Sequence, residues 1–375
     1  MKIATRAAYG KALAALGEKY PELVVLDADL SGSTMTKDFA QKYPDRFFDM
    51  GIAEGNMAGV AAGLATCGKK PFINSFAMFS AGRAWEQVRN SIAYPGLNVK
   101  VIGSHGGLSV GEDGATHQCI EDYAIMRAIP GMLVLSPCDG PEMEQAVAAL
   151  LEYDGPAYMR LGRLAVESVT DTIPGYTFEI GKGEVLQDGK DVAIIATGIM
   201  TYEAIKAGEE LRSQGINARV INMGTIKPLD EELVLKAAEE CGKIVTCEEH
   251  SVIGGLGEAV SSLLGEKCPT PVRRIGVNDE FGHSGPAAAL LKDRYPELRI
   301  VAAGYHPIEK SVSERELKDS SYIRYIKSLI QRLGLVDHVE FTGVLSEERM
   351  KEEYLKANVF VLPSTIENSP NSLAE

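Results

Sequence analysis

The chain has 375 residues, 45% of them hydrophobic, and a mean hydropathy of −0.04, which predicts a soluble globular protein of two or three domains. Its net charge of −14 argues against a nucleic-acid partner, because phosphate binding needs a basic surface. The longest apolar runs are strand-sized, and residues 1–15 include Lys2, Arg6 and Lys11, so we expect no membrane span and no secretory signal. The six cysteines form no Cys-x-x-Cys pair and no metal-like cluster with histidine, which is typical of reduced thiols in the cytoplasm.

Strand and helix patterns alternate through the first part of the chain. Helical apolar spacing at 5–19 is followed by apolar runs with helix-like stretches between them, at 23–27, 72–76, 99–103, 132–136 and 157–161. Continuous β-branched runs are typical of parallel strands buried on both faces. We therefore predict a first α/β domain over residues 1–165.

Residues 166–183 contain Pro174-Gly175 and little apolar periodicity, so we predict a linker there. A second α/β domain is predicted over 184–294. Its expected strands are 191–197, 218–223, 243–248 and 272–277, and its expected helices are 201–214, 230–240 and 255–264. The predicted fold class is α/β, with two doubly wound domains.

Glu54 is the first candidate catalytic residue. The segment 51–57, Gly-Ile-Ala-Glu-Gly-Asn-Met, places this glutamate after a strand-like run and ahead of a small-residue helix predicted at 55–67. A carboxylate in such a place is largely removed from water and can share a proton with a ring nitrogen. The alternative is that Glu54 caps the first turn of that helix, since acids are common at helix starts.

Further polar and aromatic residues follow other predicted strands. Asp29, Phe76 and His105 each stand at or just after a strand end. Ligands of open α/β sheets collect at the carboxyl ends of strands, so we expect these residues and Glu54 to converge on one pocket.

Two segments carry a family resemblance. The Glu54 motif and residues 103–118, Gly-Ser-His-Gly-Gly-Leu-Ser-Val-Gly-Glu-Asp-Gly-Ala-Thr-His-Gln, together resemble the C-terminal half of transketolase over residues 1–294. The segments 27–33 and 76–79 also match. The resemblance implies a pyrimidine-binding domain, a C-terminal domain, and thiamine-diphosphate-dependent transfer of a two-carbon ketol unit from a ketose phosphate to an aldose phosphate in the pentose phosphate pathway.

The resemblance also implies roles for single residues. Glu54 would activate the aminopyrimidine of the cofactor, whose rings Phe76 and Phe79 would contact, while Gly82 replaces the third aromatic of that series. Glu54, His105 and His117 are the candidate catalytic residues. The candidate substrate-binding residues are His105, Asp113 and Asp29 for sugar hydroxyls, His117 for the acceptor end and its phosphate, and Arg6, Ser33 and Arg160 for a phosphate clamp. Taken singly, Arg6 also fits a solvated helix residue, Asp29 a turn residue and Arg160 a surface ion-pair partner.

Nothing in the chain resembles the N-terminal transketolase domain, which binds the diphosphate and Mg²⁺. The resemblance therefore implies the C-terminal subunit of a split transketolase, with no metal site of its own. It would be inactive alone and would join an N-terminal subunit that holds Mg²⁺, in a heterotetramer. The alternatives are a 1-deoxy-D-xylulose-5-phosphate synthase-like subunit, a 2-oxoacid dehydrogenase beta-like subunit, or a non-catalytic paralogue that binds without turnover.

Residues 295–375 have a different character. The segments 339–343, Val-Glu-Phe-Thr-Gly, and 358–364, Asn-Val-Phe-Val-Leu-Pro-Ser, resemble the nucleotide-sugar domain of retaining GT-B glycosyltransferases of family 4 type. Glu367 and Glu375 reproduce that family's Glu-x7-Glu spacing. The match covers part of a Rossmann-like domain, so we expect no glycosyl transfer and interpret the junction as a fusion or a mis-joined reading frame.

Overall fold

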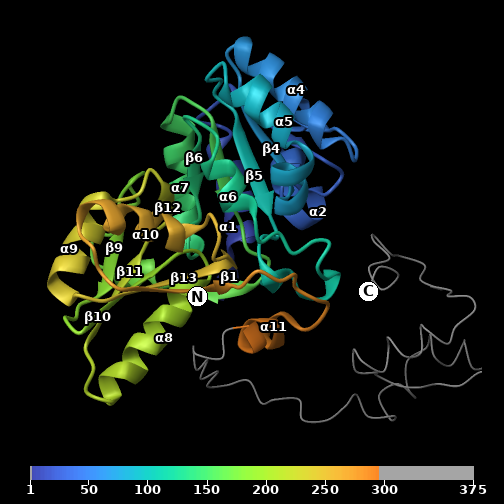
Figure 1. Cartoon of the computed structure of the whole chain (residues 1–375). Helices are drawn as coiled ribbons and strands as arrows, with labels where there is room; N and C mark the ends of the chain where they lie inside the picture. The colour runs from blue at the N-terminus through green and yellow to red at the C-terminus, as the bar shows by residue number, and fades with distance from the viewer. Residues whose placement is uncertain (1, 295–375) are drawn as a thin grey trace, which may run out of the picture. The chain divides into compact units, whose positions relative to one another are not determined.

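The computed structural model describes residues 2–294 and shows two α/β domains (Figure 1). The predicted fold class is therefore confirmed. The residues interpreted as a glycosyltransferase fragment, 295–375, lie outside the described part of the chain.

The first domain is built on a seven-stranded sheet of order β12-β6-β7-β5-β4-β2-β3. The strands β2 to β7 are parallel, and β12 runs antiparallel to β6 at one edge. Their bounds are β2 Leu23–Asp27, β3 Phe47–Asp49, β4 Lys70–Phe76, β5 Lys100–Ser104, β6 Leu133–Leu135, β7 Ala157–Arg160 and β12 Thr225–Lys227.

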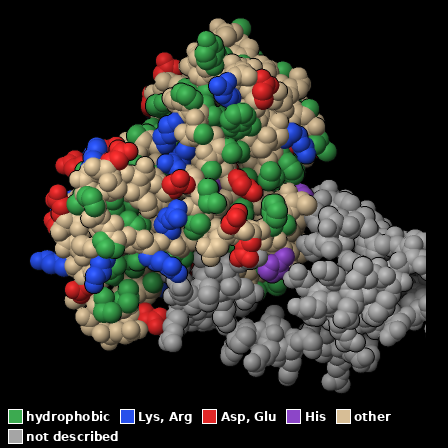
Figure 2. Space-filling view, in the orientation of Figure 1, with side chains coloured by type: hydrophobic (Ala, Val, Ile, Leu, Met, Phe, Trp, Pro, Cys, Tyr) green, Lys and Arg blue, Asp and Glu red, His purple; other side chains and the backbone are tan. Residues whose placement is uncertain are grey.

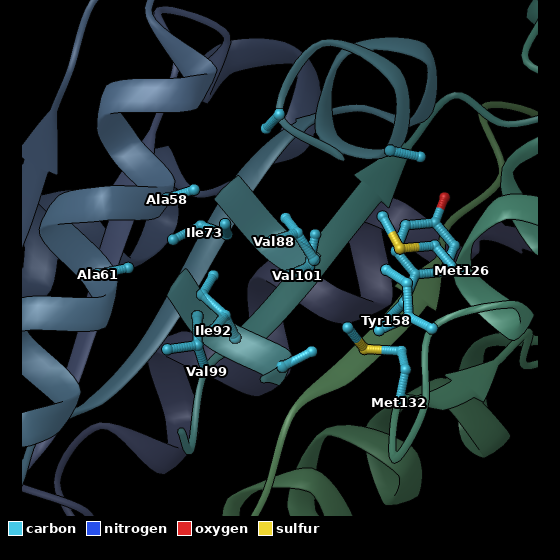
Figure 3. Close-up of a cluster of buried hydrophobic side chains, with 14 of the residues drawn as sticks. Ala58, Ala61, Ile73, Val88, Ile92, Val99, Val101, Met126, Met132 and Tyr158 are labelled. Carbon is cyan, nitrogen blue, oxygen red and sulfur yellow. The ribbon is translucent and has the colours of Figure 1, made fainter. Parts of the chain in front are cut away.

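Alternation of side chains along these strands produces two apolar layers. Leu23 and Val25 face one layer, which is covered by α1 (Thr5–Leu16), α3 (Lys37–Lys42) and α7 (Gly140–Glu152). Val24 and Leu26 face the other, where Ala58 and Ala61 of α4 (Glu54–Thr66) lie near Ile73 of β4 (Figure 3). That layer is also covered by α5 (Trp85–Gln87), α6 (Asp122–Arg127) and two π-helical segments, η2 (Met78–Arg83) and η3 (Val88–Ala93).

The direction of winding reverses next to β2. The chain passes from β2 to β3 through α3 on one face, and from β3 to β4 through α4 (Glu54–Thr66) on the other face. Such a reversal opens a crevice at the carboxyl ends of the flanking strands, where ligands of α/β sheets usually bind. Glu54, the first residue of α4, enters at this crevice.

The second domain has a five-stranded sheet of order β14-β13-β10-β11-β9, in which β9 is antiparallel to β11. Helix α8 covers one face, while α9 and α10 cover the other (Figure 1). The bounds are β9 Glu184–Gln187, β10 Val192–Ala196, α8 Met200–Ser213, β11 Ala218–Asn222, α9 Glu231–Cys241, β13 Ile244–Ser251, α10 Leu256–Lys267, β14 Val272–Val277 and α11 Ala287–Arg294.

The segment predicted as a linker is ordered against the first domain. Its strand β8 (Ala165–Glu167) pairs with β1 (Lys2–Ala4), and the buried Asp139 carboxylate accepts hydrogen bonds from the backbone of Val169 and Thr170. Phe178 is buried in the core of the first domain. Isolated strands of three residues show no sequence periodicity, which is why the sequence does not predict β1, β8 and β12.

No described helix is long and apolar enough to cross a membrane. On the face shown in Figure 2, acidic and basic side chains of the described residues are interspersed, without a large basic patch.

Candidate functional site

Glu54 is 1% exposed and does not cap its own helix. Its Oε1 accepts a hydrogen bond from the Ser75 hydroxyl at 3.2 Å, and its Oε2 pairs with Arg83 Nη1 at 2.9 Å. The carboxylate is therefore directed across the crevice toward β4 and η2, and the helix-capping alternative does not describe it.

Two aromatic rings lie beside this carboxylate. Phe76 ends β4 and Phe79 lies in η2, with ring centroids 6.2 Å apart and planes 13° from parallel. The Arg83 guanidinium stands 4.5 Å from the centroid of Phe79. At Gly82 an added Cβ would approach only the Met78 terminal methyl, at 3.1 Å. π-Helical turns are frequent at functional sites, and here one places Phe79 and Arg83 on the same side as Glu54.

His105 continues the aromatic cluster. Its imidazole stacks on Phe76 at 4.1 Å, and its backbone has a φ of 58°, in the left-handed region that side-chain-bearing residues rarely adopt. Burial, then the charges of Arg6 and Arg163, lower the pKa of His105 to about 3. The ring is therefore neutral at neutral pH, with one nitrogen that donates and one that accepts.

His117 closes the cluster from the loop that follows β5. Its ring meets Phe79 edge-on at 5.4 Å and Phe76 at 6.0 Å. Burial lowers the pKa of His117, while the nearby Asp113 charge acts in the opposite direction. Asp113 ends the short helix η4 (Leu108–Asp113), so the structure brings both histidines, Asp113 and the two phenylalanines together.

Arg6 contacts the backbone of Ser33. Arg6 Nη1 donates to the Ser33 carbonyl oxygen at 2.7 Å, and its Nε is buried without a partner among the described residues. Burial and the charge of Arg163 lower the pKa of Arg6. Asp29 is exposed with a φ of 60°, and its backbone N–H donates to the Asp49 carboxylate at 3.2 Å.

Arg160 is not available for a phosphate clamp. It is the last residue of β7, it is 5% exposed, and its guanidinium pairs with Asp122. Its remaining donors reach the carbonyl oxygens of Glu249 at 2.7 Å and Cys119 at 2.9 Å. The assignment of Arg160 to the clamp is therefore corrected, because Asp122 and two backbone carbonyl oxygens already occupy its guanidinium.

A second arginine, Arg163, follows Arg160 at the end of β7. It lies beyond the end of β7, its side chain is 34% exposed, and it donates to Val110 O and to Glu112 at 2.9 Å. Its charge lowers the pKa of both Arg6 and His105. Sequence analysis missed Arg163 and Arg83; the position of Arg163 after the strand, instead of within it, was the available signal.

Cys138, Asp139 and Glu142 form a buried group whose donor atoms lie within 4.8 Å of one another. Protein donors already occupy the carboxylates: Glu142 accepts from Tyr176 and Asn222, and Asp139 accepts from Thr170. Asn222 belongs to the second domain, so this group ties the two domains together.

The sequence matches two family models over nearly all of the described residues. Residues 1–168 match the pyrimidine-binding domain of transketolase, and residues 181–299 match the transketolase C-terminal domain. The chain belongs to the transketolase family. The tail, 285–375, matches glycosyl transferases group 1, so the resemblance found for each part is confirmed, and residues 285–299 match both families.

Some relatives are matched by this chain over nearly their whole length. A protein of Methanocaldococcus jannaschii named as a transketolase C-terminal section is 52% identical over 288 residues, which cover 76% of this chain and 90% of the relative. A 6-deoxy-6-sulfo-D-fructose transketolase subunit of a Clostridium species is 48% identical over 310 residues, covering 81% and 94%. A solved structure described as a split gene transketolase, an inactive beta4 tetramer, has a TM-score of 0.72 at 54% identity and covers 78% of this chain and 93% of that one.

The residues present fit thiamine diphosphate, the cofactor that the family implies. An aminopyrimidine is a planar ring with hydrogen-bonding nitrogens, and the site offers a buried carboxylate beside two nearly parallel aromatic rings. When bound, the cofactor supplies the carbanion chemistry of ketol transfer.

Proposed function

We propose that this chain is the C-terminal subunit of a split transketolase that transfers a two-carbon ketol unit from a ketose phosphate to an aldose phosphate. The carrying observation is the continuous cluster of Glu54, Phe76, Phe79, His105 and His117 at the crevice of the first sheet. We place the reaction in the cytoplasm, within pentose phosphate metabolism.

Glu54 would hold a proton at the ring nitrogen of the bound aminopyrimidine. Ser75 and Arg83 keep its carboxylate directed into the crevice, and water is excluded because Glu54 is buried. Arg83 therefore acts as a positioning residue for Glu54.

The two histidines would bind the sugar on the other side of the phenylalanines. Neutral imidazoles both donate and accept, which suits hydroxyl groups, and the lowered pKa values of His105 and His117 keep them neutral. Asp113 and Asp29 add carboxylate acceptors for further hydroxyls.

The sugar phosphate would lie between Arg6 and Arg163, with Ser33 beside them. The charge of Arg163 lowers the pKa of Arg6, and a phosphate dianion between the two guanidinium groups would offset their repulsion. Arg6 Nε also has a free N–H to donate.

An N-terminal subunit would complete the site by holding the diphosphate and Mg²⁺, in a heterotetramer. The relatives named as separate transketolase subunits support this division, because this chain covers 90% and 94% of their lengths. Exposed apolar side chains also surround the start of α4, with Ile52 at 74% and Val60 at 38% exposure, as expected of a subunit contact.

Reconstitution tests the proposal. The chain should be inactive alone, and it should acquire ketol transfer from xylulose 5-phosphate to ribose 5-phosphate when mixed with an N-terminal transketolase subunit, thiamine diphosphate and Mg²⁺. Pyruvate with glyceraldehyde 3-phosphate, and branched 2-oxoacids, serve as donors for the synthase-like and dehydrogenase-like alternatives. Turnover on those donors alone would replace transketolase with the corresponding reaction.

The absent aromatic at Gly82 favours a second candidate, a non-catalytic paralogue. Such a subunit would bind the N-terminal subunit and the cofactor, seen as a change in absorbance or fluorescence on mixing, without turning over any pentose, hexose or heptulose phosphate.

We propose that residues 295–375 take no part in either reaction and are not a working glycosyltransferase. Sequencing genomic DNA across codons 285–305 distinguishes a gene fusion from a mis-joined frame. Micromolar binding of a nucleoside-diphosphate sugar by the whole chain, lost in Glu375→Ala, would contradict this interpretation.

A further inference from the structure

The loop that carries the candidate substrate residues is built into the second domain. Residues 105–120 leave β5 of the first domain, yet Leu108 and Ile120 are buried in the apolar layer formed with Ile194 and Met200. Ser251 of β13 donates its backbone N–H to Ile120 O at 2.8 Å. The positions of His105, Asp113 and His117 therefore depend on contacts made by the second domain.

Glu249 of β13 is the charged group at the centre of these contacts. It is 4% exposed, and its carboxylate accepts hydrogen bonds from the Ser109 backbone N–H and from the Ser109 hydroxyl, the latter at 3.2 Å. A Cβ at Gly107, whose φ is 80°, would overlap this carboxylate. The loop backbone is thus pressed against Glu249, and only glycine permits that approach.

Arg160 fixes Glu249 relative to the loop. Its guanidinium pairs with the buried Asp122 and donates both to Glu249 O at 2.7 Å and to Cys119 O at 2.9 Å. One arginine therefore holds the strand that carries Glu249 and the far end of the loop. Gln118 closes the loop internally by donating to Leu108 O and Gly111 O.

We propose that Glu249 is a positioning residue by which the C-terminal domain holds the 105–117 loop in its substrate-binding arrangement. The carboxylate lies on the side of the loop that faces the second domain, so it acts through Ser109 and not on the sugar. The expected change in KM for sugar phosphates rests on the proposed transketolase function, whereas the expected change in hydrogen–deuterium exchange of the loop does not.

Glu248 provides a matched control. It is the neighbouring residue on β13, it is equally buried, and its carboxylate accepts from the backbone N–H groups of Leu256 and Gly257 at the start of α10. Removing either glutamate leaves buried donors unpaired, so both alanine variants should lose stability. The donors unpaired in Glu249→Ala belong to Ser109 of the loop, whereas the backbone donors of Leu256 and Gly257 unpaired in Glu248→Ala belong to α10.

The test compares Glu249→Ala, Glu249→Gln and Glu248→Ala in the full-length chain. Hydrogen–deuterium exchange should rise about tenfold or more at residues 106–112 in Glu249→Ala, rise less in Glu249→Gln, whose amide oxygen still accepts from Ser109, and stay unchanged in Glu248→Ala. In the reconstituted enzyme, Glu249→Ala should raise KM for the sugar phosphates about tenfold or more while kcat changes less.

Two results would overturn the proposal. One is unchanged exchange at 106–112 in both Glu249 variants, and the other is an equal effect of Glu248→Ala on exchange or on KM. If Glu249→Ala does not fold, Glu249→Gln decides by the same measurements. If no pair of subunits turns over, the function fails, while the exchange measurement still decides whether Glu249 holds the loop.

Discussion

The two domains share a doubly wound design but use their strand ends differently. In the first domain, Glu54, Phe76 and His105 meet at the carboxyl ends of the strands and leave polar atoms for a ligand. In the second, the Thr197 hydroxyl donates to Met223 O at 2.8 Å, and the Glu248 carboxylate accepts from Leu256 N at 2.7 Å. The strand ends of the second domain are thus occupied by the protein itself.

The cavity between the two domains is small. A cavity of about 20 Å³ lies among Thr5, Ser136, Thr197 and Glu249, too small for a sugar phosphate. One fold therefore provides the proposed reaction site in one copy and the proposed support for that site in the other, which is why function must be argued from side chains.

The largest expected effect is a loss of kcat when Glu54, at the proposed site of the first domain, is replaced. Glu54→Gln keeps the shape of the side chain but weakens proton sharing with the cofactor ring, so kcat of the reconstituted enzyme should fall about 10²- to 10⁴-fold. Steady-state rates with saturating cofactor measure it. Glu86→Gln, an exchange on an exposed helix residue nearby, is the control and should leave kcat unchanged; full turnover by Glu54→Gln would show that the carboxylate has no catalytic role.

The next largest effect is a loss of stability when Arg160, which contacts the second domain through Glu249 O, is replaced. Arg160→Ala leaves Asp122 buried without its partner, so the free energy of unfolding should fall by about 3–5 kcal/mol. Chemical denaturation measures it. Lys267→Ala, which breaks an exposed pair with Glu231, should cost less than about 1 kcal/mol. Equal, small losses in both variants would mean that the buried Arg160–Asp122 pair stabilises the protein little.

Arg160 and Arg163 show how far sequence reasoning reaches. Long apolar runs predicted the central strands, because five buried residues in succession leave few alternatives, and the strand-end rule brought Glu54, Phe76 and His105 together. The strand-end rule failed at Arg160. The sequence does not fix the end of a strand to within three residues, and that distance separates Arg160, inside β7, from Arg163, beyond it. The contacts of Glu249 with Ser109 join residues 140 positions apart, and no local pattern encodes such a pair.

A pH effect on stability is expected from Glu248 of the second domain. Burial raises the pKa of Glu248 from its ordinary value to about 7, so the folded state favours the protonated form. Its stabilising contribution is full below the unfolded pKa, near 4.5, and is lost as the pH rises through 7, by about 3 kcal/mol at most. His250 beside it has a pKa lowered to about 4 and acts oppositely.

The difference in unfolding free energy between the wild type and Glu248→Gln therefore isolates the effect, because the contribution of His250 cancels. We expect this difference to shift against the wild type between pH 4.5 and 8. A constant difference across that range would show that Glu248 titrates normally.

A smaller effect concerns the phosphate. Arg163→Ala should raise KM for phosphorylated acceptors about 10- to 100-fold, the usual loss for one charge-assisted hydrogen bond, with little change for glycolaldehyde, which has no phosphate. Arg6→Ala should behave alike. An equal loss on both acceptors would assign Arg163 a structural role through Val110 and Glu112.

The smallest expected effect is a gain in cofactor affinity at Gly82, the position where the family resemblance predicts a third aromatic residue after Phe76 and Phe79. Gly82→Tyr would add a ring next to Phe79, and its Cβ would meet only the flexible end of Met78. An added aromatic contact contributes about 0.5–1.5 kcal/mol, so the Kd for thiamine diphosphate in the reconstituted enzyme should fall about 2- to 10-fold. Fluorescence titration measures it, with Gly82→Ala as the control for helix propensity alone. Weaker binding in Gly82→Tyr would mean that the ring displaces Arg83 from Glu54, and that glycine is needed here to keep that ion pair in place.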